Sequence, residues 1–419
     1  LTGALLDRLK LDSKRFAGMI DGVEAMDRFT KLIASEPDII NPVCMAWDER
    51  GRLWVAETVD YPNEITSSRK GRDSIKILED TDGDGKCDKV TVFASGLNLP
   101  TSITFSNGGI IVAHAPDFLY FKDTDGDDVA DVREVLNSKW GTRDSHAGPS
   151  NLRYGFDNNI WGTVGYSAWD GPDWNKEGYF AQAVYKMNPD GSDVTFLHQF
   201  NNNTWGLGFN ESGDVFGSTA NNNPAFFCGF PVTGYAETQG LSAKMIADSP
   251  AFHPITPNVR QVDVFGGYTA GAGYALATSK NFPESWRSSM AFIAGPTGNL
   301  LGMYQNIPDG SGYLAKNQFS LIASADEWFS PVAAEIGPDG NLWIANFGAG
   351  DLDKKISVVT SRGEWFNIPQ LGGGILQTLE NPTDIVMAEK NIFLIGSSKD
   401  DGLFVLKLDQ NSDSDGQPD

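Results

Sequence analysis

The 419-residue sequence is poor in cysteine, histidine and basic residues. Its three cysteines, Cys44, Cys87 and Cys228, are too few for a disulfide framework and show no CxxC spacing. The 32 Lys and Arg residues stand against 55 Asp and Glu residues, which gives a formal charge of -23. Such a chain repels phosphate backbones, so we expect no nucleic-acid partner.

Long apolar runs and several common catalytic motifs are also missing. No window approaches the roughly 18 uncharged apolar residues that a membrane-spanning helix needs, so no direct membrane insertion is expected. The sequence contains no HExxH, GxSxG or GxxxxGK[ST] motif. It therefore gives no support to a zinc peptidase, a hydrolase with a nucleophile elbow or a P-loop nucleotidase.

What the sequence does contain is a hairpin motif that recurs from residue 40 onward. Each copy has two strands of alternating apolar residues joined by a tight turn rich in Asp, Asn and Gly. In the clearest copies the second strand carries Leu or Ile followed by Trp. The seven copies begin at Asn41, Leu99, Gly148, Thr204, Ala272, Ser330 and Asn381.

These units predict an all-β protein, because each interval between copies is long enough for a small antiparallel sheet. Sheets repeated around an axis form a β-propeller, which leaves few exposed sheet edges. Seven blades are preferred, with six as the alternative if the final unit pairs elsewhere. The segment 29–35 is expected to supply a strand that closes the ring against the last unit.

The predicted propeller occupies residues 27–408. Residues 1–26 differ from it and predict a short N-terminal helix, in which Leu5 and Leu9 alternate with charged residues. This helical segment is either foreign to the propeller or a linker. Residues 409–419 form the start of a C-terminal Asp-rich calcium loop.

Two further Asp-rich loops, DTDGDGKCD from Asp80 and DTDGDDVAD from Asp123, follow the ligand spacing of calcium-binding loops. Alternate carboxylates in such a turn converge on one point. The predicted metal ligands are Asp80, Asp82, Asp84, Asp88, Asp123, Asp125, Asp127, Asp131 and Glu134. The second loop has Asp128 where the first has Gly85. Loops of this kind without regulatory helices suit exported proteins, so the sequence predicts structural Ca²⁺ and a periplasmic or extracellular location.

In a propeller, the loops beside the innermost strands meet at one end of the central channel. His146, Asp144, His114 and Tyr166 fall in these loops and are the candidate catalytic residues. The residues expected to contact a ligand or cofactor there are Asn202, Asn203, Trp205, Asn346 and Lys399. This polar and aromatic funnel favours a carbohydrate or another small polar substrate.

Longer segments carry a family resemblance. Four segments resemble the membrane-bound dehydrogenase propellers of planctomycetes, verrucomicrobia and related bacteria. They are RLWVAETVDYPN, the first Asp-rich loop with its continuation to GLNLPTSI, the strand after His146, and FSPVAAEIGPDGNLWIANF. The resemblance covers about residues 27–408. Those proteins are distant relatives of the soluble quinoprotein glucose and sorbosone dehydrogenases.

The resemblance implies a sugar-active oxidoreductase with pyrroloquinoline quinone (PQQ) as cofactor, His146 as base and a separate protein that accepts the electrons. Where characterised relatives have an Arg-Asn pair, this chain has Asn202 and Asn203. PQQ carries three carboxylates, for which the funnel offers Arg143, Arg260 and Lys399 as cations. The alternatives are a polysaccharide lyase or hydrolase on a propeller scaffold, and a propeller that binds carbohydrate or protein without catalysis.

Overall fold

The computed structural model describes residues 30–62, 66, 68–171, 179–231, 245–255, 259, 266–324, 328–347, 355–359, 382–389, 392–397 and 402–407. Within these ranges the protein is all-β, apart from a 3-10 turn at Pro296–Gly298. The predicted N-terminal helix and the third Asp-rich loop lie outside the described residues.

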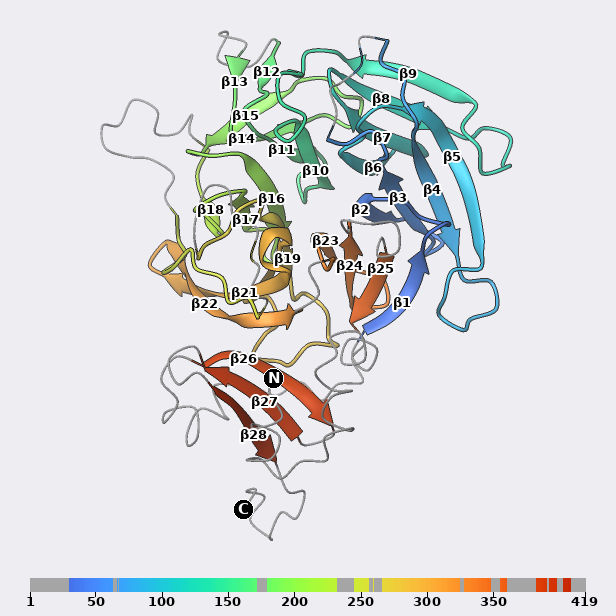
Figure 1. Ribbon diagram of the computed structural model, residues 1–419. Helices are drawn as coiled ribbons and strands as arrows, with labels where there is room; N and C mark the ends of the chain where they lie inside the picture. Colours follow the sequence, from blue (N-terminus) through green and yellow to red (C-terminus); the bar gives the residue numbers. More distant parts are fainter. Residues whose placement is uncertain are drawn as a thin grey trace, which may run out of the picture.

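Six antiparallel sheets surround a central axis (Figure 1). Sheet 1 contains β2 (Pro42–Trp47), β3 (Leu53–Glu57), β4 (Asp73–Glu79) and β5 (Lys89–Leu97). Sheet 2 contains β6 (Ser102–Ser106), β7 (Gly109–His114), β8 (Asp117–Lys122) and β9 (Val132–Asn137). Sheet 3 contains β10 (Pro149–Tyr154), β11 (Ile160–Val164), β14 (Ala183–Met187) and β15 (Thr195–Gln199).

The second half of the ring follows the same plan. Sheet 4 contains β16 (Thr204–Phe209), β17 (Val215–Thr219) and β18 (Phe226–Cys228). Sheet 5 contains β19 (Ala272–Leu276), β20 (Met290–Gly295), β21 (Leu300–Asp309) and β22 (Gly312–Ala323). Sheet 6 contains β23 (Pro331–Ile336), β24 (Leu342–Asn346), β25 (Lys355–Val359) and the N-terminal β1 (Thr30–Ser35). A small hairpin, β12 (Trp169–Asp170) with β13 (Tyr179–Phe180), projects from sheet 3.

The ring is closed by pairing between its two ends. The innermost strands β2, β6, β10, β16, β19 and β23 contact one another in a complete cycle. β1 pairs antiparallel with β25, with Lys31 opposite Val358. The segment predicted to close the ring thus supplies the outer strand of sheet 6.

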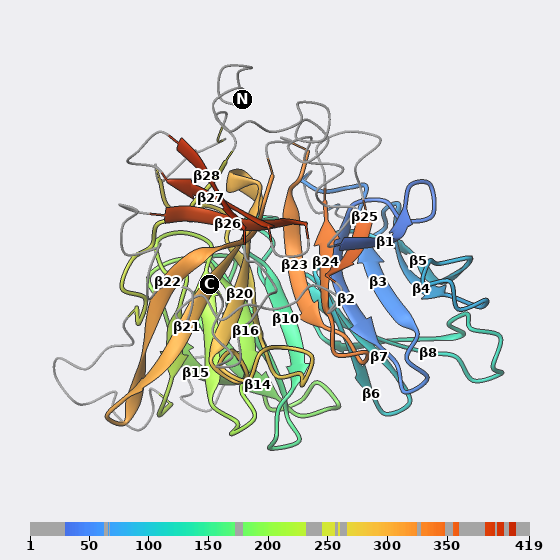
Figure 2. The ribbon, with the colours of Figure 1, turned by 90° about the horizontal axis from the view of Figure 1, so that it is seen from below.

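The last hairpin unit lies outside this cycle. β26 (Pro382–Glu389), β27 (Ile392–Ser397) and β28 (Gly402–Lys407) form a separate three-stranded sheet. Figures 1 and 2 place it beside sheet 5, and β26 contacts β22. The described cycle therefore does not confirm the preferred count of seven blades, and its six sheets match the alternative in which the final unit pairs elsewhere.

Five of the six innermost strands have a bulge near their start. The register shifts between Pro42 and Cys44 in β2, and at equivalent places in β10, β16, β19 and β23. A bulge increases the local twist of a strand. Gly206 in β16 also requires its lack of a side chain, because a Cβ there would lie 2.4 Å from the Gly273 carbonyl oxygen.

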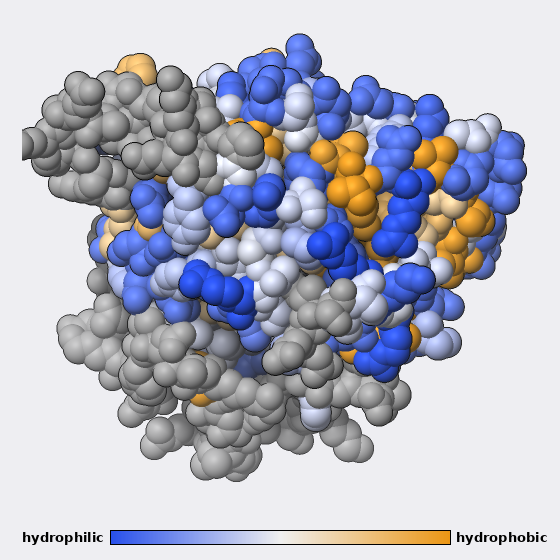
Figure 3. All heavy atoms as spheres, turned by 90° about the horizontal axis from the view of Figure 1, so that it is seen from above, coloured by the Kyte–Doolittle hydropathy of each residue, from blue (hydrophilic) through white to orange (hydrophobic). Residues whose placement is uncertain are grey.

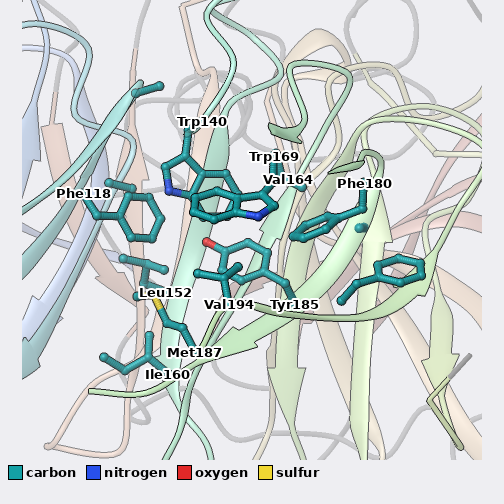
Figure 4. Close-up of a cluster of buried hydrophobic side chains, with 14 of the residues drawn as sticks. Phe118, Trp140, Leu152, Ile160, Val164, Trp169, Phe180, Tyr185, Met187 and Val194 are labelled. Carbon is teal, nitrogen blue, oxygen red and sulfur yellow. The ribbon is translucent and has the colours of Figure 1, made fainter. Parts of the chain in front are cut away.

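Aromatic side chains fill the space between neighbouring sheets. Between sheets 2 and 3, Phe118 stacks on Trp140, and Trp140 packs on Tyr185, with ring centroids 4.7 Å apart in both pairs (Figure 4). Burial of large rings of this kind supplies much of a core's stability. The sheets are therefore held to one another mainly by apolar packing.

A repeated Asp–Trp hydrogen bond fixes the first hairpin of three sheets. The Nε1 atom of Trp54 donates to Asp48, that of Trp161 to Asp157 and that of Trp343 to Asp339, over 2.9 to 3.0 Å. The Trp of the sequence motif is thus a structural part of the hairpin, as expected of blade packing.

The outer surface is mostly hydrophilic. Figure 3 shows one side of the ring, where hydrophobic patches are set among hydrophilic residues. Independently of that view, Val92 and Val135 on outer strands are exposed. Among the described residues, no helix is long and apolar enough to cross a lipid bilayer.

Candidate functional site

One end of the ring, here called the mouth, gathers the loops that precede each innermost strand and those that follow each second strand. The pairing places these ends together, because Pro149 lies opposite Val164, Thr204 opposite Thr219 and Pro331 opposite Asn346. The mouth comprises residues 58–62, 143–148, 165–168, 202–203, 220–223 and 346–347. The sequence-predicted funnel residues that the structure describes are therefore brought to one end.

The mouth presents an exposed histidine oriented by a carboxylate. Nδ1 of His146 lies 3.0 Å from Oδ1 of Asp144, and the backbone N of His146 donates to the same oxygen over 2.9 Å. The His146 side chain is 55% exposed and that of Asp144 is 41% exposed. If Nδ1 carries the proton donated to Asp144, Nε2 keeps its lone pair and can accept a proton from a ligand.

The loop that carries this pair is anchored to its own sheet. Asp144 N donates to the Ser167 hydroxyl over 3.2 Å, and that hydroxyl donates to Asp144 O over 2.7 Å. Nη2 of Arg143 donates to the Tyr166 carbonyl over 2.8 Å. Two backbone contacts of Asp144 and one side-chain contact of Arg143 therefore hold residues 143–144 beside the loop that follows β11.

Tyr61 brings three sheets together at the mouth. Its ring lies edge-on to His146 of sheet 3, with centroids 5.1 Å apart, and edge-on to Phe347 of sheet 6, with centroids 5.5 Å apart. Tyr61 itself follows β3 of sheet 1. Burial, together with the negative charge of Asp144, raises the pKa of Tyr61 to about 12, so its phenol stays protonated at neutral pH.

A channel cavity of about 360 Å³ lies along the axis between the innermost strands of all six sheets. Arg153 of β10 and Glu335 of β23 form an ion pair across it, and Nε of Arg153 also donates to Leu207 O over 2.7 Å. Cys44 lines the same cavity, and burial raises the pKa of its thiol to about 12. Cys44 is therefore a neutral thiol at physiological pH.

The two described Asp-rich loops lie at the opposite end of the ring. They form the turns between β4 and β5 and between β8 and β9, which follow strands that run away from the mouth. Two clusters offer carboxylate oxygens within 4.8 Å of one another: Asp80, Asp82 and Asp88, and Asp123, Asp125 and Asp131. Oxygen ligands on a tight turn fit a hard cation such as Ca²⁺.

A family sequence model described as "Domain of unknown function (DUF7133)" matches residues 23–349. The chain belongs to this family. No curated protein is significantly similar in sequence.

Solved structures share the fold at low identity. A Thermus thermophilus protein assigned as an oxidoreductase (glucose dehydrogenase) has a TM-score of 0.52 and 12% identity, covering 79% of this chain and 99% of its own. A Trichoderma reesei protein of Carbohydrate-Active Enzymes Family AA12, in its calcium structure, has a TM-score of 0.50 and 12% identity, covering 79% of this chain and 95% of its own. These likenesses show a shared propeller fold. The sequence resemblance to membrane-bound dehydrogenases stays a prediction.

The candidate base His114 is buried. It is 1% exposed, and its Nε2 accepts a hydrogen bond from the backbone N of Asn98 over 3.0 Å. Burial, with the positive charge of Arg133, lowers its pKa to about 4. Because its acceptor nitrogen is occupied and the ring is out of reach of solvent, His114 is a structural residue of sheet 2 in this arrangement.

Among the residues predicted to contact a ligand, three asparagines bind the backbone of mouth loops and Trp205 lies in the channel. Asn203 Oδ1 accepts from Tyr166 N over 2.9 Å, and Asn346 Oδ1 accepts from Ser330 N over 2.5 Å, so both amides hold mouth loops together. Asn202 caps the neighbouring turn by accepting from Asn203 N. The Tyr166 side chain remains exposed at the mouth, while Trp205 lines the channel. Lys399 lies outside the described residues.

The described donor set does not fit PQQ. Most cations beside the mouth are already paired: Arg69 with Asp117, Arg72 with Asp60 and Lys76 with Glu57, each over 2.8 to 2.9 Å. Arg143, a guanidinium at the mouth, donates to the Tyr166 carbonyl oxygen instead. One such group is too few for three carboxylates. Arg260, like Lys399, lies outside the described part of the chain.

Three of the predicted metal ligands lie outside the two clusters. Glu134 lies within β9 opposite Tyr120 and is outside the second cluster, because the strand has already begun at Val132. Asp84 and Asp127 accept bonds from the backbone N of Lys86 and Val129 and are not members of the two clusters.

The replacement of the loop glycine by Asp128 has a structural reason. Asp128 adopts the positive φ of 64° that the turn requires. Its carboxylate pairs with Nη1 of Arg52, 2.9 Å away in sheet 1. The second loop is therefore tied to the neighbouring sheet.

Sequence reasoning missed Phe347 and the pair of Arg153 with Glu335. Phe347 directly follows the second strand of its hairpin, and Tyr61 follows the second strand of its own hairpin a few residues later. A position just after such a strand could therefore have identified Phe347 as a mouth residue. The ion pair had a signal as well, because each residue stands four places before the Asp of its Asp–Trp hydrogen bond.

Proposed function

We propose that this protein is a carbohydrate-active oxidoreductase in which His146 accepts the proton of a substrate hydroxyl at the mouth. The observation that carries the proposal is the bond between His146 Nδ1 and Asp144, on a ring that is more than half exposed. Asp144 orients the imidazole and stabilises its positive charge once the proton has been accepted. His146 thus acts as a general base, and Asp144 is the carboxylate that orients it.

The other mouth residues suit a polyhydroxylated ligand. Phe347 and Tyr166 offer aromatic surface for the apolar face of a sugar ring, and the Arg143 guanidinium offers hydrogen-bond donors. The hydride released in such an oxidation belongs to an electron acceptor, to which we assign no residue. The fold shared with a protein assigned as a glucose dehydrogenase supports the reaction class.

The test is an activity assay on the full chain. Neutral and acidic sugars are supplied with an electron-accepting dye, with and without added PQQ and Ca²⁺. We expect sugar-dependent reduction of the dye. Sugar binding without reduction under any of these conditions would overturn the oxidoreductase assignment and favour a carbohydrate-binding propeller.

A lyase acting on uronic acids is the second candidate, and one observation favours it. Arg143 is anchored to the Tyr166 carbonyl three residues before His146, so a cation, a base and a phenol lie on adjoining loops. A cation can neutralise the uronate carboxylate while the base removes the neighbouring proton. The lyase would release an unsaturated sugar, detected by its ultraviolet absorbance, and would reduce no dye.

We also propose that the Asp-rich loops hold structural Ca²⁺ and that the protein works in the periplasm or outside the cell. Three carboxylates on each exposed turn repel one another unless a cation joins them. Loops of this type bind calcium weakly, so they are occupied where calcium is abundant, which is outside the cytoplasm. A partner protein that accepts electrons remains part of the proposal for an oxidoreductase.

A further inference from the structure

We propose that Tyr61 is a positioning residue that holds the His146 ring in its working orientation across the mouth. The inference deepens the proposed function, since it concerns how the same site is kept ready. It names a residue from sheet 1, whereas His146 belongs to sheet 3, so the geometry of the base depends on a contact between two sheets.

The first step is the contact itself. The Tyr61 and His146 rings meet edge to face, with centroids 5.1 Å apart and planes inclined by 70°. This is a preferred geometry for aromatic pairs, because the positive edge of one ring faces the negative face of the other. His146 belongs to an exposed loop, so a directional contact of this kind restricts a ring that solvent alone would leave free.

The second step is that Tyr61 is itself fixed. Its side chain is partly buried and packs edge-on to Phe347 at 5.5 Å, with planes inclined by 81°. Its backbone N donates to the Thr58 hydroxyl over 3.1 Å. A positioning group must be more rigid than the group it positions, and Tyr61 meets that condition.

The third step is a second link between the same two segments. The Ser145 hydroxyl donates to Pro62 O over 3.1 Å, so residues adjacent to both rings are also joined. Asp144 fixes the Nδ1 side of the imidazole over 3.0 Å. With Asp144 holding one side and Tyr61 holding the ring plane, Nε2 is the part of the ring left for a ligand.

The division of roles is consistent with the charges present. A Tyr61 phenolate would compete with Asp144 for the imidazole proton. Burial and the Asp144 charge keep the phenol protonated instead, because they raise its pKa to about 12. Tyr61 therefore acts through the placement of its ring, and the hydroxyl group is not required for that role.

The experiment compares Tyr61→Phe, which keeps the ring, with Tyr61→Leu, which removes it. The control is Tyr154→Leu, which removes an exposed tyrosine at the other end of β10. The readout is the NMR signals and pH titration of His146 in isotope-labelled full-length protein, assigned with His146→Gln. We expect Tyr61→Leu to shift the ring signals toward free-histidine values and to change the titration, while Tyr61→Phe and Tyr154→Leu match wild type.

A catalytic readout accompanies the spectroscopic one. We expect kcat to fall about two- to tenfold in Tyr61→Leu, the range that one aromatic pair corresponds to, with a smaller change in KM and recovery in Tyr61→Phe. His146 signals and titration that are unchanged in Tyr61→Leu would overturn the inference. The NMR result decides the positioning role even if no sugar oxidation is found, so failure of the proposed function is a distinguishable outcome.

Discussion

The Arg153 guanidinium and the Glu335 carboxylate form an ion pair that crosses the central channel, joining sheet 3 to sheet 6 on the opposite side of the ring. Both side chains are mostly buried, with 26% and 19% exposure. The pair is the one direct charge contact across the channel among the described residues that line the cavity.

Removing one partner should destabilise the ring. Glu335→Gln leaves the Arg153 charge without its partner, and we expect the free energy of unfolding to fall by about 1–3 kcal/mol. Chemical denaturation measures this value. The double variant Arg153→Met, Glu335→Leu should recover part of the loss, since no charge then remains in the channel. Single variants as stable as wild type would show that the pair contributes nothing.

The buried His114 predicts a defined pH dependence of stability. Its folded pKa of about 4 lies below its ordinary value of 6.5, so between these values the unfolded chain binds a proton that the folded chain does not. Its contribution to stability is complete above pH 6.5 and is lost as the pH falls toward 4. His198 is lowered to about 4 by burial and adds to the same window.

Thermal melting of wild type and His114→Gln across this range measures the effect. The glutamine can still accept the Asn98 hydrogen bond, and it does not titrate. We expect the variant to show a shallower loss of Tm between pH 6.5 and 4 than wild type, because one group that binds a proton only in the unfolded chain has been removed. Identical slopes would mean that folding does not lower the pKa of His114, and would contradict this prediction.

Calcium should raise Tm by mass action, because the folded loops alone present converged carboxylates. Asp82→Ala removes a member of the first cluster and should abolish much of the calcium-dependent shift. Asp84→Ala is the matched control in the same loop, outside that cluster, and should retain the shift. Melting that is insensitive to both calcium and chelator would contradict the assignment.

Ring closure through β1 predicts different effects for two truncations. Deleting residues 1–26 leaves β1 intact and should preserve a single cooperative transition. Deleting residues 1–36 removes the strand that pairs with β25, and we expect a broadened transition at lower temperature. Calorimetry distinguishes the two. A cooperative, unshifted transition after the longer deletion would show that closure does not depend on β1.

The repeat pattern predicted most of the fold because it acts locally. Alternating strands and Asp- or Gly-containing turns determine each hairpin, and the Asp–Trp hydrogen bonds give the motif a physical cause. The segment before the first unit supplies a closing strand as expected, but it pairs with the sixth unit and not with the last one. The strand that pairs with β1 could not be predicted, because pairing between β1 and β25 depends on residues more than 300 positions apart.

The position of the site was predicted, but the roles of its residues were predicted only in part. Strand ends placed His146 and Asp144 at the mouth, yet the same rule gave no means to tell exposed His146 from buried His114, whose environment is set by Asn98 of sheet 1. The contact of Tyr61 with His146 joins sheets 1 and 3. Such contacts depend on how sheets are arranged around the axis, which a hairpin pattern does not contain.

The central claim is that the His146 imidazole accepts the substrate proton. The most direct measurement is the sugar-dependent turnover of His146→Ala in the absence and presence of added imidazole. We predict that kcat/KM falls about 10²- to 10⁴-fold with little change in Tm, and that imidazole restores part of the rate. A variant that turns over sugar at nearly the wild-type rate would contradict the account.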